Sequence, residues 1–238
     1  MATEKNCCVP KVKHLWRVSV SEAIAIQESL KRYICFSDGK EKIERVAGVD
    51  GAYYKYSGVA AAVVCRYPTL EVLEEKVATE EVDFPYIPGL LAFREGPLIL
   101  KTLAQLSLEP DLFFFNGHGL AHPRGLGLAT HLGILLDKPS VGCARRLLPG
   151  FTLTSQPGPG SFAPVEFNGR KVGLALRTPY RGQLLFVSPG HRISMEKAMA
   201  IVKACLCEES FLPWPLYLAH SLAAQKKEKL QPGEGENG

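Results

Sequence analysis

The stretch Asp111–Gly125, DLFFFNGHGLAHPRG, contains a short apolar run that ends abruptly in glycines, histidines and an arginine. A Phe-rich run of this length, closed by glycine, is typical of a strand that is buried on both faces. In open α/β sheets, ligands bind just beyond the carboxyl ends of such strands, and Gly117 and Gly119 permit close approach of the backbone to a ligand. The stretch therefore predicts a buried strand that leads into a ligand-binding loop. The alternative is an ordinary strand-to-helix turn.

The composition indicates one globular domain. Of the 238 residues 46% are hydrophobic, which favours a single domain over residues 1–224, followed by a disordered polar tail over 225–238. A net charge of +4 permits a nucleic-acid partner without requiring one. The N-terminus lacks the apolar core of a secretion signal, and no apolar run reaches the ~18 residues that span a membrane. We therefore expect a soluble, cytoplasmic protein without a membrane partner, whose seven cysteines are reduced.

The order of the expected elements indicates a mixed α/β fold. Three β-type runs with short Gly- or Pro-containing links predict an antiparallel meander: Arg45–Tyr54, Gly58–Arg66 and Leu70 to about Val82. A helix, the strand within Asp111–Gly125, a second helix over Leu128–Leu136 and a buried strand over Pro139–Ala144 follow. A meander followed by α/β units is the order of an RNase H-like fold. Such a fold has a central mixed sheet with helices on both faces.

Two acidic residues occupy apolar surroundings. Asp50 interrupts an apolar run, although Asp is depleted in strands. A carboxylate in such a run needs a partner such as a cation, unless it faces solvent at a strand end. Glu95 is in register with the apolar residues of the helix that follows it, and burial of a carboxylate is costly unless the carboxylate is coordinated.

An RNase H-like fold brings its first strand, the following helix and its fourth strand to a common point. Here Asp50, Glu95 and Asn116 hold these positions. Two carboxylates and a carbonyl oxygen are hard ligands appropriate to Mg²⁺. The usual chemistry of such a site is in-line attack of a metal-activated water on a phosphodiester.

The segment 84–97, FPYIPGLLAFREGP, predicts a stiff loop with an apolar tip. Pro85 and Pro88 restrict the backbone on either side of Tyr86 and Ile87. Nucleic-acid-binding proteins push apolar side chains of this kind between stacked bases. The alternative is that Tyr86 covers the core.

From about Trp16 to His220 the chain resembles the endonuclease V family. The motifs are VAGVD at 46–50, FPYIPGLLAFRE at 84–95, the G-x-G-x-x-HPR frame at 117–124 and SPGH at 188–191. The resemblance implies a monomeric, RNase H-like DNA-repair nuclease that requires Mg²⁺ or Mn²⁺. It further implies binding of inosine-containing DNA or RNA and hydrolysis of the second phosphodiester 3′ to the inosine.

The resemblance also implies roles for individual residues. It makes Asp50, Glu95 and Asn116 the metal ligands and catalytic groups, with His220 facing them from the last helix and Arg145 at the position of an active-site lysine. The expected substrate contacts are the tip of the 84–97 loop, which would act as a wedge between stacked bases, a pocket for hypoxanthine and two residues of the HPR motif. The residues concerned are Pro85, Tyr86, Ile87, Pro88, Gly89, Gly117, Gly119, His122 and Arg124.

Three positions depart from the family pattern. Asn116 replaces an aspartate, Arg145 replaces a lysine, and Leu216-Tyr217 replaces a Thr-Arg pair. Asparagine offers a metal only a neutral carbonyl oxygen, so the site loses one negative charge. Two hypotheses follow: an active inosine-specific endonuclease, or a protein that binds inosine-containing nucleic acid and has weakened catalysis.

The other histidines carry weaker signals. We expect His191 to lie in a loop with at most a supporting role, and His131 to pack inside its helix. His14 has no supporting context in the sequence.

Overall fold

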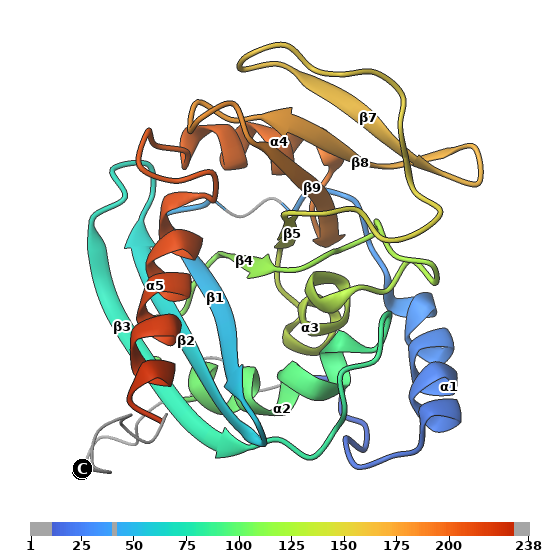
Figure 1. Cartoon of the computed structure of the whole chain (residues 1–238), viewed down its shortest axis with the longest axis vertical. Helices are drawn as coiled ribbons and strands as arrows, with labels where there is room; N and C mark the ends of the chain where they lie inside the picture. Colours follow the sequence, from blue (N-terminus) through green and yellow to red (C-terminus); the bar gives the residue numbers. More distant parts are fainter. Residues whose placement is uncertain (1–10, 40–41, 231–238) are drawn as a thin grey trace, which may run out of the picture.

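A mixed β-sheet forms the centre of the molecule (Figure 1). The computed structural model describes residues 11–39 and 42–230, and its sheet has the strand order β3-β2-β1-β4-β5-β9-β8-β7-β6. The strands are β1 (Arg45–Tyr54), β2 (Ser57–Arg66), β3 (Val72–Glu81), β4 (Leu112–Asn116), β5 (Ser140–Ala144), β6 (Thr152–Leu153), β7 (Phe162–Phe167), β8 (Arg170–Arg177) and β9 (Leu184–His191). The helices are α1 (Val20–Leu30), η1 (Lys31–Tyr33), α2 (Leu91–Leu103), α3 (Leu128–Leu136), α4 (Met195–Ala204) and α5 (Trp214–Glu228).

The pairing of the strands confirms the predicted fold. Strands β1, β2 and β3 form an antiparallel meander, and β1 then pairs in parallel with β4, as β4 does with β5. The remaining pairs are antiparallel, so the sheet is mixed. Because β1 and β4 are parallel neighbours with Val49 opposite Phe115, the next residues along each strand, Asp50 and Asn116, meet at the same edge of the sheet.

Helices cover both faces of the sheet, as the alternation of side chains along the strands requires. On β1, Val46 faces a core that includes residues of α4 and α5, whereas Ala47 faces a core built with α2 and α3. Helix α5 lies along β1 and β2 in Figure 1. The site residues therefore come from the sheet, through β1, and from the helix layers on its two faces, through α2 and α5.

Helix α5 approaches β1 unusually closely at Gly48. A Cβ atom on Gly48 would lie 2.1 Å from the carbonyl carbon of Pro215. Only glycine leaves room for this contact, since real Cβ atoms do not approach other atoms so closely. The contact seats the first turn of α5 on the sheet, and His220 lies further along the same helix.

The segment before α1 packs against α2 and α3, the helices on the face of the sheet opposite α5. The His14 Nε2 and His131 Nε2 atoms lie 2.7 Å apart, and His14 Nδ1 donates to the carbonyl of Leu15 at 2.7 Å. In the neutral pair, His131 must therefore donate from Nε2 to Nε2 of His14. Trp16 stacks on His131, and a Cβ atom added to Gly96 of α2 would collide with the Trp16 ring. The histidine pair thus fixes the segment beside Glu95.

Two expectations need correction. His191 is the last residue of β9 and not a loop residue, because its strand continues past Ser188. Residues 225–228 are not part of a disordered tail, because α5 continues to Glu228 through lysines that are good helix formers and favour a helix C-terminus. Residues 231–238 of that predicted tail lie outside the described residues. The short strand β6 has no clear signal in the sequence.

Two further expectations concern cysteines and membranes. The five cysteines within the described ranges are free thiols. Across the described part of the chain, none of the helices combines the length and the apolar character needed to cross a bilayer.

Candidate active site

Three elements converge on Asp50. Its Oδ2 atom accepts a hydrogen bond from Asn116 Nδ2 at 3.1 Å and lies 2.6 Å from His220 Nδ1, while its Oδ1 accepts from the backbone of Gly51 at 2.9 Å. The carboxylate is only 5% exposed. A buried charge of this kind is tolerated because donors satisfy its oxygens. The structure thus brings Asp50, Asn116 and His220 together, as the sequence predicted.

Glu95 completes the acidic centre from helix α2. Burial raises the pKa of its carboxyl well above the usual value, and the nearby charge of Asp50 raises it further, while Arg94 acts in the opposite direction. Among the described residues, no hydrogen bond or ion pair reaches this carboxylate. Glu95 is therefore a buried acid near a second acid, and the charge of Arg94 offsets its burial and this repulsion only in part.

This donor set fits a divalent cation. A positive ion would compensate the unpartnered Glu95 and the repulsion between Glu95 and Asp50. Within the described ranges, no cluster of three or more His, Cys, Asp or Glu side chains is arranged to hold a metal. A divalent ion at this point would therefore rely on the amide oxygen of Asn116 as the third protein ligand.

The expected wedge projects from the surface beside this centre. Tyr86 is 67% exposed, so it does not cover the core. Ile87 instead packs against the cluster formed by Ala23, Leu90 and Phe93. Ile87 anchors the loop, and the ring of Tyr86 remains free to contact a ligand.

Three side chains fix the base of the wedge through one carbonyl. The carbonyl oxygen of Gly89 accepts from Arg124 at 2.6 Å, His122 at 3.0 Å and Gln27 at 3.1 Å. Gly89 has φ = +82°, which glycine adopts without strain. Arg124 also donates to the Gln27 side chain at 2.6 Å. His122 and Arg124 therefore position the loop, and His122 also lines the pocket described next.

A pocket between the wedge and the loop after β4 unites most of the expected substrate-binding residues. Its lining includes Tyr86, Ile87, Pro88, Gly89, Gly117, His118 and His122. Its empty volume is about 450 Å³, including the open mouth. Gly119 lies outside this lining, and its N–H donates to Ser188 Oγ at 2.8 Å. Pro85 lines a neighbouring pocket with Trp16.

Arg145 lies at the surface near the end of β5. Its guanidinium carbon is 4.5 Å from the centre of the Phe211 ring. This distance allows a cation–π contact, which orients the guanidinium. No ion pair joins Arg145 to Asp50 or Glu95 in the described part of the chain.

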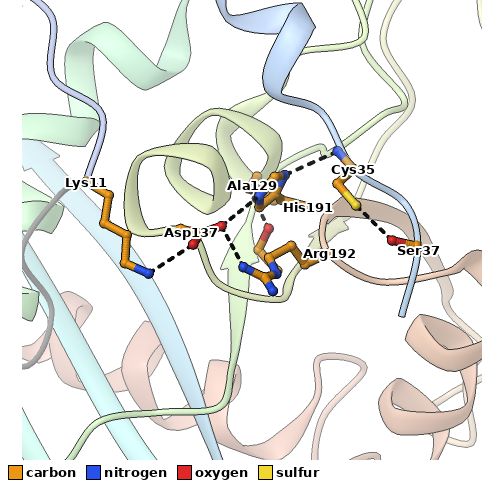
Figure 2. A network of polar contacts seen from close by, with 8 residues as sticks. Lys11, Cys35, Ser37, Ala129, Asp137, His191 and Arg192 are labelled. Atoms are coloured by element: carbon orange, nitrogen blue, oxygen red, sulfur yellow. Dashed lines mark hydrogen bonds and ion pairs between the residues drawn. The ribbon is translucent and has the colours of Figure 1, made fainter. Parts of the chain in front are cut away.

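His191 belongs to a different polar network. Figure 2 shows it between Cys35 and Asp137: Cys35 N donates to His191 Nδ1 at 3.4 Å, and His191 Nε2 lies 3.5 Å from Asp137. Burial opposes ionisation of Asp137, but hydrogen bonds from Lys11 and Arg192 outweigh it and lower the Asp137 pKa to about 2. His191 pairs with the first residue of β5, whereas Asn116 pairs near its end, at Cys143. His191 therefore joins chain segments away from the acidic centre.

Two residues at the site, Gln27 and His118, are not singled out by the motifs. Gln27 is 1% exposed although it is polar, and it follows Ala23 by one helical turn. A polar residue within the apolar stripe of a helix is a signal that could have revealed it. His118 occupies a variable position of the G-x-G frame, and burial lowers its pKa to about 4, so its imidazole is neutral.

Comparisons with known proteins show the family of this chain. The family model for endonuclease V matches residues 28–221. The endonuclease V of Roseiflexus sp. (strain RS-1) is 47% identical over 194 residues, which cover 80% of this chain and 86% of the relative. The crystal structure of endonuclease V from Bacillus subtilis superposes with a TM-score of 0.86 at 31% identity, covering 92% and 96% of the two chains.

A structure from Ciona intestinalis includes nucleic acid. That endonuclease V was solved in complex with a 24mer DNA that contains an inosine followed by a ribo-adenosine. It matches with a TM-score of 0.79 at 26% identity and covers 89% of this chain and 99% of its own.

The mixed sheet and its buried acidic pair thus define an α/β nuclease, an enzyme that acts on phosphodiester bonds. More particularly, the chain belongs to the endonuclease V family.

Proposed function

We propose that this protein is a divalent-metal-dependent endonuclease that recognises inosine in DNA or RNA and hydrolyses the second phosphodiester 3′ to it. The observation that carries the proposal is the buried pair of Asp50 and Glu95 beside a pocket lined by Gly89 and Gly117. The Ciona intestinalis relative binds inosine-containing DNA, which supports the same choice of ligand. We further propose that the protein acts as a cytoplasmic monomer in nucleic-acid repair.

Different residues would have different roles in metal binding and in substrate positioning. Asp50, Glu95 and the amide oxygen of Asn116 would hold Mg²⁺ or Mn²⁺, which when bound would activate water and stabilise the charge on the phosphate. His220 orients the Asp50 carboxylate through its 2.6 Å contact. Tyr86 enters the base stack, and the carbonyl of Gly89, fixed by its three donors, sets the position of the wedge relative to the pocket.

A second function is favoured by one specific contact. Asn116 donates to Asp50 at 3.1 Å, so an amide N–H already satisfies an oxygen that a cation would otherwise use. An aspartate at this position could not donate such a bond. The alternative is therefore a protein that binds inosine-containing nucleic acid but cuts it slowly.

The test measures binding and cleavage side by side. Oligonucleotides that contain inosine or adenosine in the same sequence are titrated with protein without metal, and nicking is followed with Mg²⁺ and with Mn²⁺. Metal-dependent nicking at the second phosphodiester 3′ to inosine would support the endonuclease. Inosine-selective binding without nicking would favour the binding protein, and equal binding to both oligonucleotides would contradict both.

A further inference from the structure

Two separate segments of the chain form walls of the pocket beside the wedge. One wall consists of residues 86–89, the wedge loop, and another comes from residues between 117 and 128, in the segment after β4. Gln27 of helix α1 also lines the pocket, although it is only 1% exposed. The shape of the pocket therefore depends on how the two walls are held relative to each other.

The carboxamide of Gln27 joins the two walls. Its Nε2 atom donates to the carbonyl oxygen of Gly89 at 3.1 Å and to that of Leu126 at 3.2 Å. Its Oε1 atom accepts from Nε of Arg124 at 2.6 Å. Because carbonyls only accept and a guanidinium only donates, these partners fix the orientation of the amide. Both amide hydrogens are used, so Gln27 acts on a bound base through the two walls and not as a donor to it.

The apolar packing of α1 spans the same two walls. Ala23, one turn before Gln27, belongs to the cluster against which Ile87 of the wedge loop packs. Leu30, about one turn after Gln27, belongs to a buried cluster with Leu126. The spacing of these three α1 residues places them on one face of the helix. Helix α1 therefore contacts both walls, and Gln27 supplies the polar connection between the two apolar contacts.

A duplex makes a demand on this connection that a single strand does not. In a duplex, the tip of the wedge loop is pressed against stacked bases, and the target base must leave the stack to be read. Unless the loop is tied to the second wall, that pressure displaces one wall of the pocket from the other. In a single strand the base is already free to enter the pocket.

We propose that Gln27 is a positioning residue that couples insertion of the Tyr86 wedge to capture of the flipped base, an inference that rests on the proposed inosine recognition. The coupling is a property of the connection between the walls and not of either wall alone. It should therefore affect base selection in duplexes and leave base selection in single strands unchanged.

Two substitutions of Gln27 test the coupling. Gln27→Met keeps the length of the side chain without its hydrogen bonds, and Gln27→Glu keeps an acceptor for Arg124 but loses both amide hydrogens. The readout is the inosine preference, the ratio of the Kd values for adenosine and inosine oligonucleotides of one sequence without metal. We expect each variant to lower the preference about tenfold in duplexes and to leave it unchanged in single strands. Every protein is measured on the same oligonucleotides, so differences in duplex stability cancel.

Thr102→Val is the matched control. Thr102 is also buried, and its hydroxyl donates to the carbonyls of Leu98 and Ala60. Its substitution removes buried hydrogen bonds on α2 without touching either wall of the pocket. Both inosine preferences should therefore stay as in the unsubstituted protein.

A cycle with Tyr86→Ala gives a readout that does not depend on the folding of a Gln27 variant, since Tyr86 is exposed. In the unsubstituted background, Tyr86→Ala should lower the duplex inosine preference about tenfold. In the Gln27→Met background, it should lower the preference little further, because the wedge and the pocket no longer act together.

Several outcomes would overturn the inference. Equal losses of preference in duplexes and single strands on Gln27→Met would make Gln27 a structural residue of the pocket. An unchanged duplex preference in Gln27→Met, or in Tyr86→Ala, would show that the wedge and the pocket act independently. Each of these results leaves the proposed function intact, whereas equal binding of inosine and adenosine by the unsubstituted protein would overturn both.

Discussion

The Nδ1 atom of His220 lies 2.6 Å from Oδ2 of Asp50, although 170 positions separate the two residues in the chain. The same oxygen accepts from Asn116, and the other carboxylate oxygen accepts from Gly51. Asp50 is therefore stabilised by protein donors before any cation binds. A metal at this site must compete with these bonds, which makes the identity of residue 116 decisive for metal affinity.

Asn116→Asp should destabilise the metal-free protein and strengthen its response to metal. The substitution removes the hydrogen bond to Asp50 and places two carboxylates side by side. We expect the free energy of unfolding without metal to fall by about 1–3 kcal/mol, the rise in Tm on adding Mg²⁺ to increase, and inosine-dependent nicking to accelerate.

Asn116→Ala is the matched control for this prediction. It removes the same hydrogen bond without adding charge, so it should destabilise the protein without any gain in metal response. If Asn116→Asp neither binds Mg²⁺ more tightly nor cuts faster, the changes at Arg145, Leu216 and Tyr217 have dismantled the site beyond residue 116.

Glu95→Gln should stabilise the metal-free protein and abolish its response to metal. The folded-state pKa of Glu95 is raised, so its carboxyl favours the folded state at low pH and this contribution is lost as pH rises through the folded pKa. Above that pKa the neutral amide of Gln avoids the cost of burying an ionised carboxyl, so the substitution should raise the free energy of unfolding there. Thermal unfolding with and without Mg²⁺ measures both effects. The exposed carboxylate of Glu80 provides the control, since Glu80→Gln should change neither.

Tyr86→Ala should weaken binding to inosine in duplexes more than in single strands. A wedge offsets the cost of unstacking, a few kcal/mol per step, only where bases are stacked. Fluorescence anisotropy with both forms of one oligonucleotide tests this, and Tyr86→Phe should retain duplex binding because the ring remains. An equal loss for the two forms would assign Tyr86 a role other than that of a wedge.

The buried histidines should make the protein less stable below about pH 6.5. Burial lowers the pKa of His14 and His131, so below their ordinary pKa the unfolded chain binds more protons than the folded chain, and the free energy of unfolding falls as pH falls. Each such histidine contributes a slope of up to about 1.4 kcal/mol per pH unit. Urea unfolding between pH 7 and pH 4.5 should give a smaller slope for His131→Leu.

The control for the pH dependence is Thr130→Ala on the same helix. Thr130 is also buried but does not titrate, so its substitution should leave the slope unchanged whatever its effect on stability. A slope for His131→Leu equal to that of the unsubstituted protein would contradict the prediction.

Gly48→Ala should displace α5 from the sheet. The added Cβ atom would lie 2.1 Å from the Pro215 carbonyl carbon, and overpacking of this kind costs about 1–3 kcal/mol or more. Because His220 is on α5, inosine-dependent nicking should fall as well. Gly158→Ala serves as the control, since its Cβ atom would lie at an ordinary 3.6 Å from Ser161. Unfolding in urea and the nicking rate provide the two readouts.

Much of the fold follows from local sequence patterns. The apolar run that becomes β4 and the three β-type runs of the meander predict strands within a residue or two of their observed bounds, because burial on one or both faces fixes their composition. Asp50 and Glu95 are recognisable in sequence for the opposite reason. A carboxylate in an apolar stripe is costly, so it marks a site.

The partners of these residues are decided by the tertiary structure. Only the packing of α5 on Gly48 brings His220 to Asp50, and only the folded chain brings Gln27, His122 and Arg124 to the carbonyl of Gly89. Sequence periodicity reports which face of an element is buried, but hydrogen bonds between distant segments depend on orientations that no local pattern encodes. The sequence by itself therefore determined the acidic centre and its fold, whereas tertiary packing decided which donors surround Asp50 and which side chains hold the wedge.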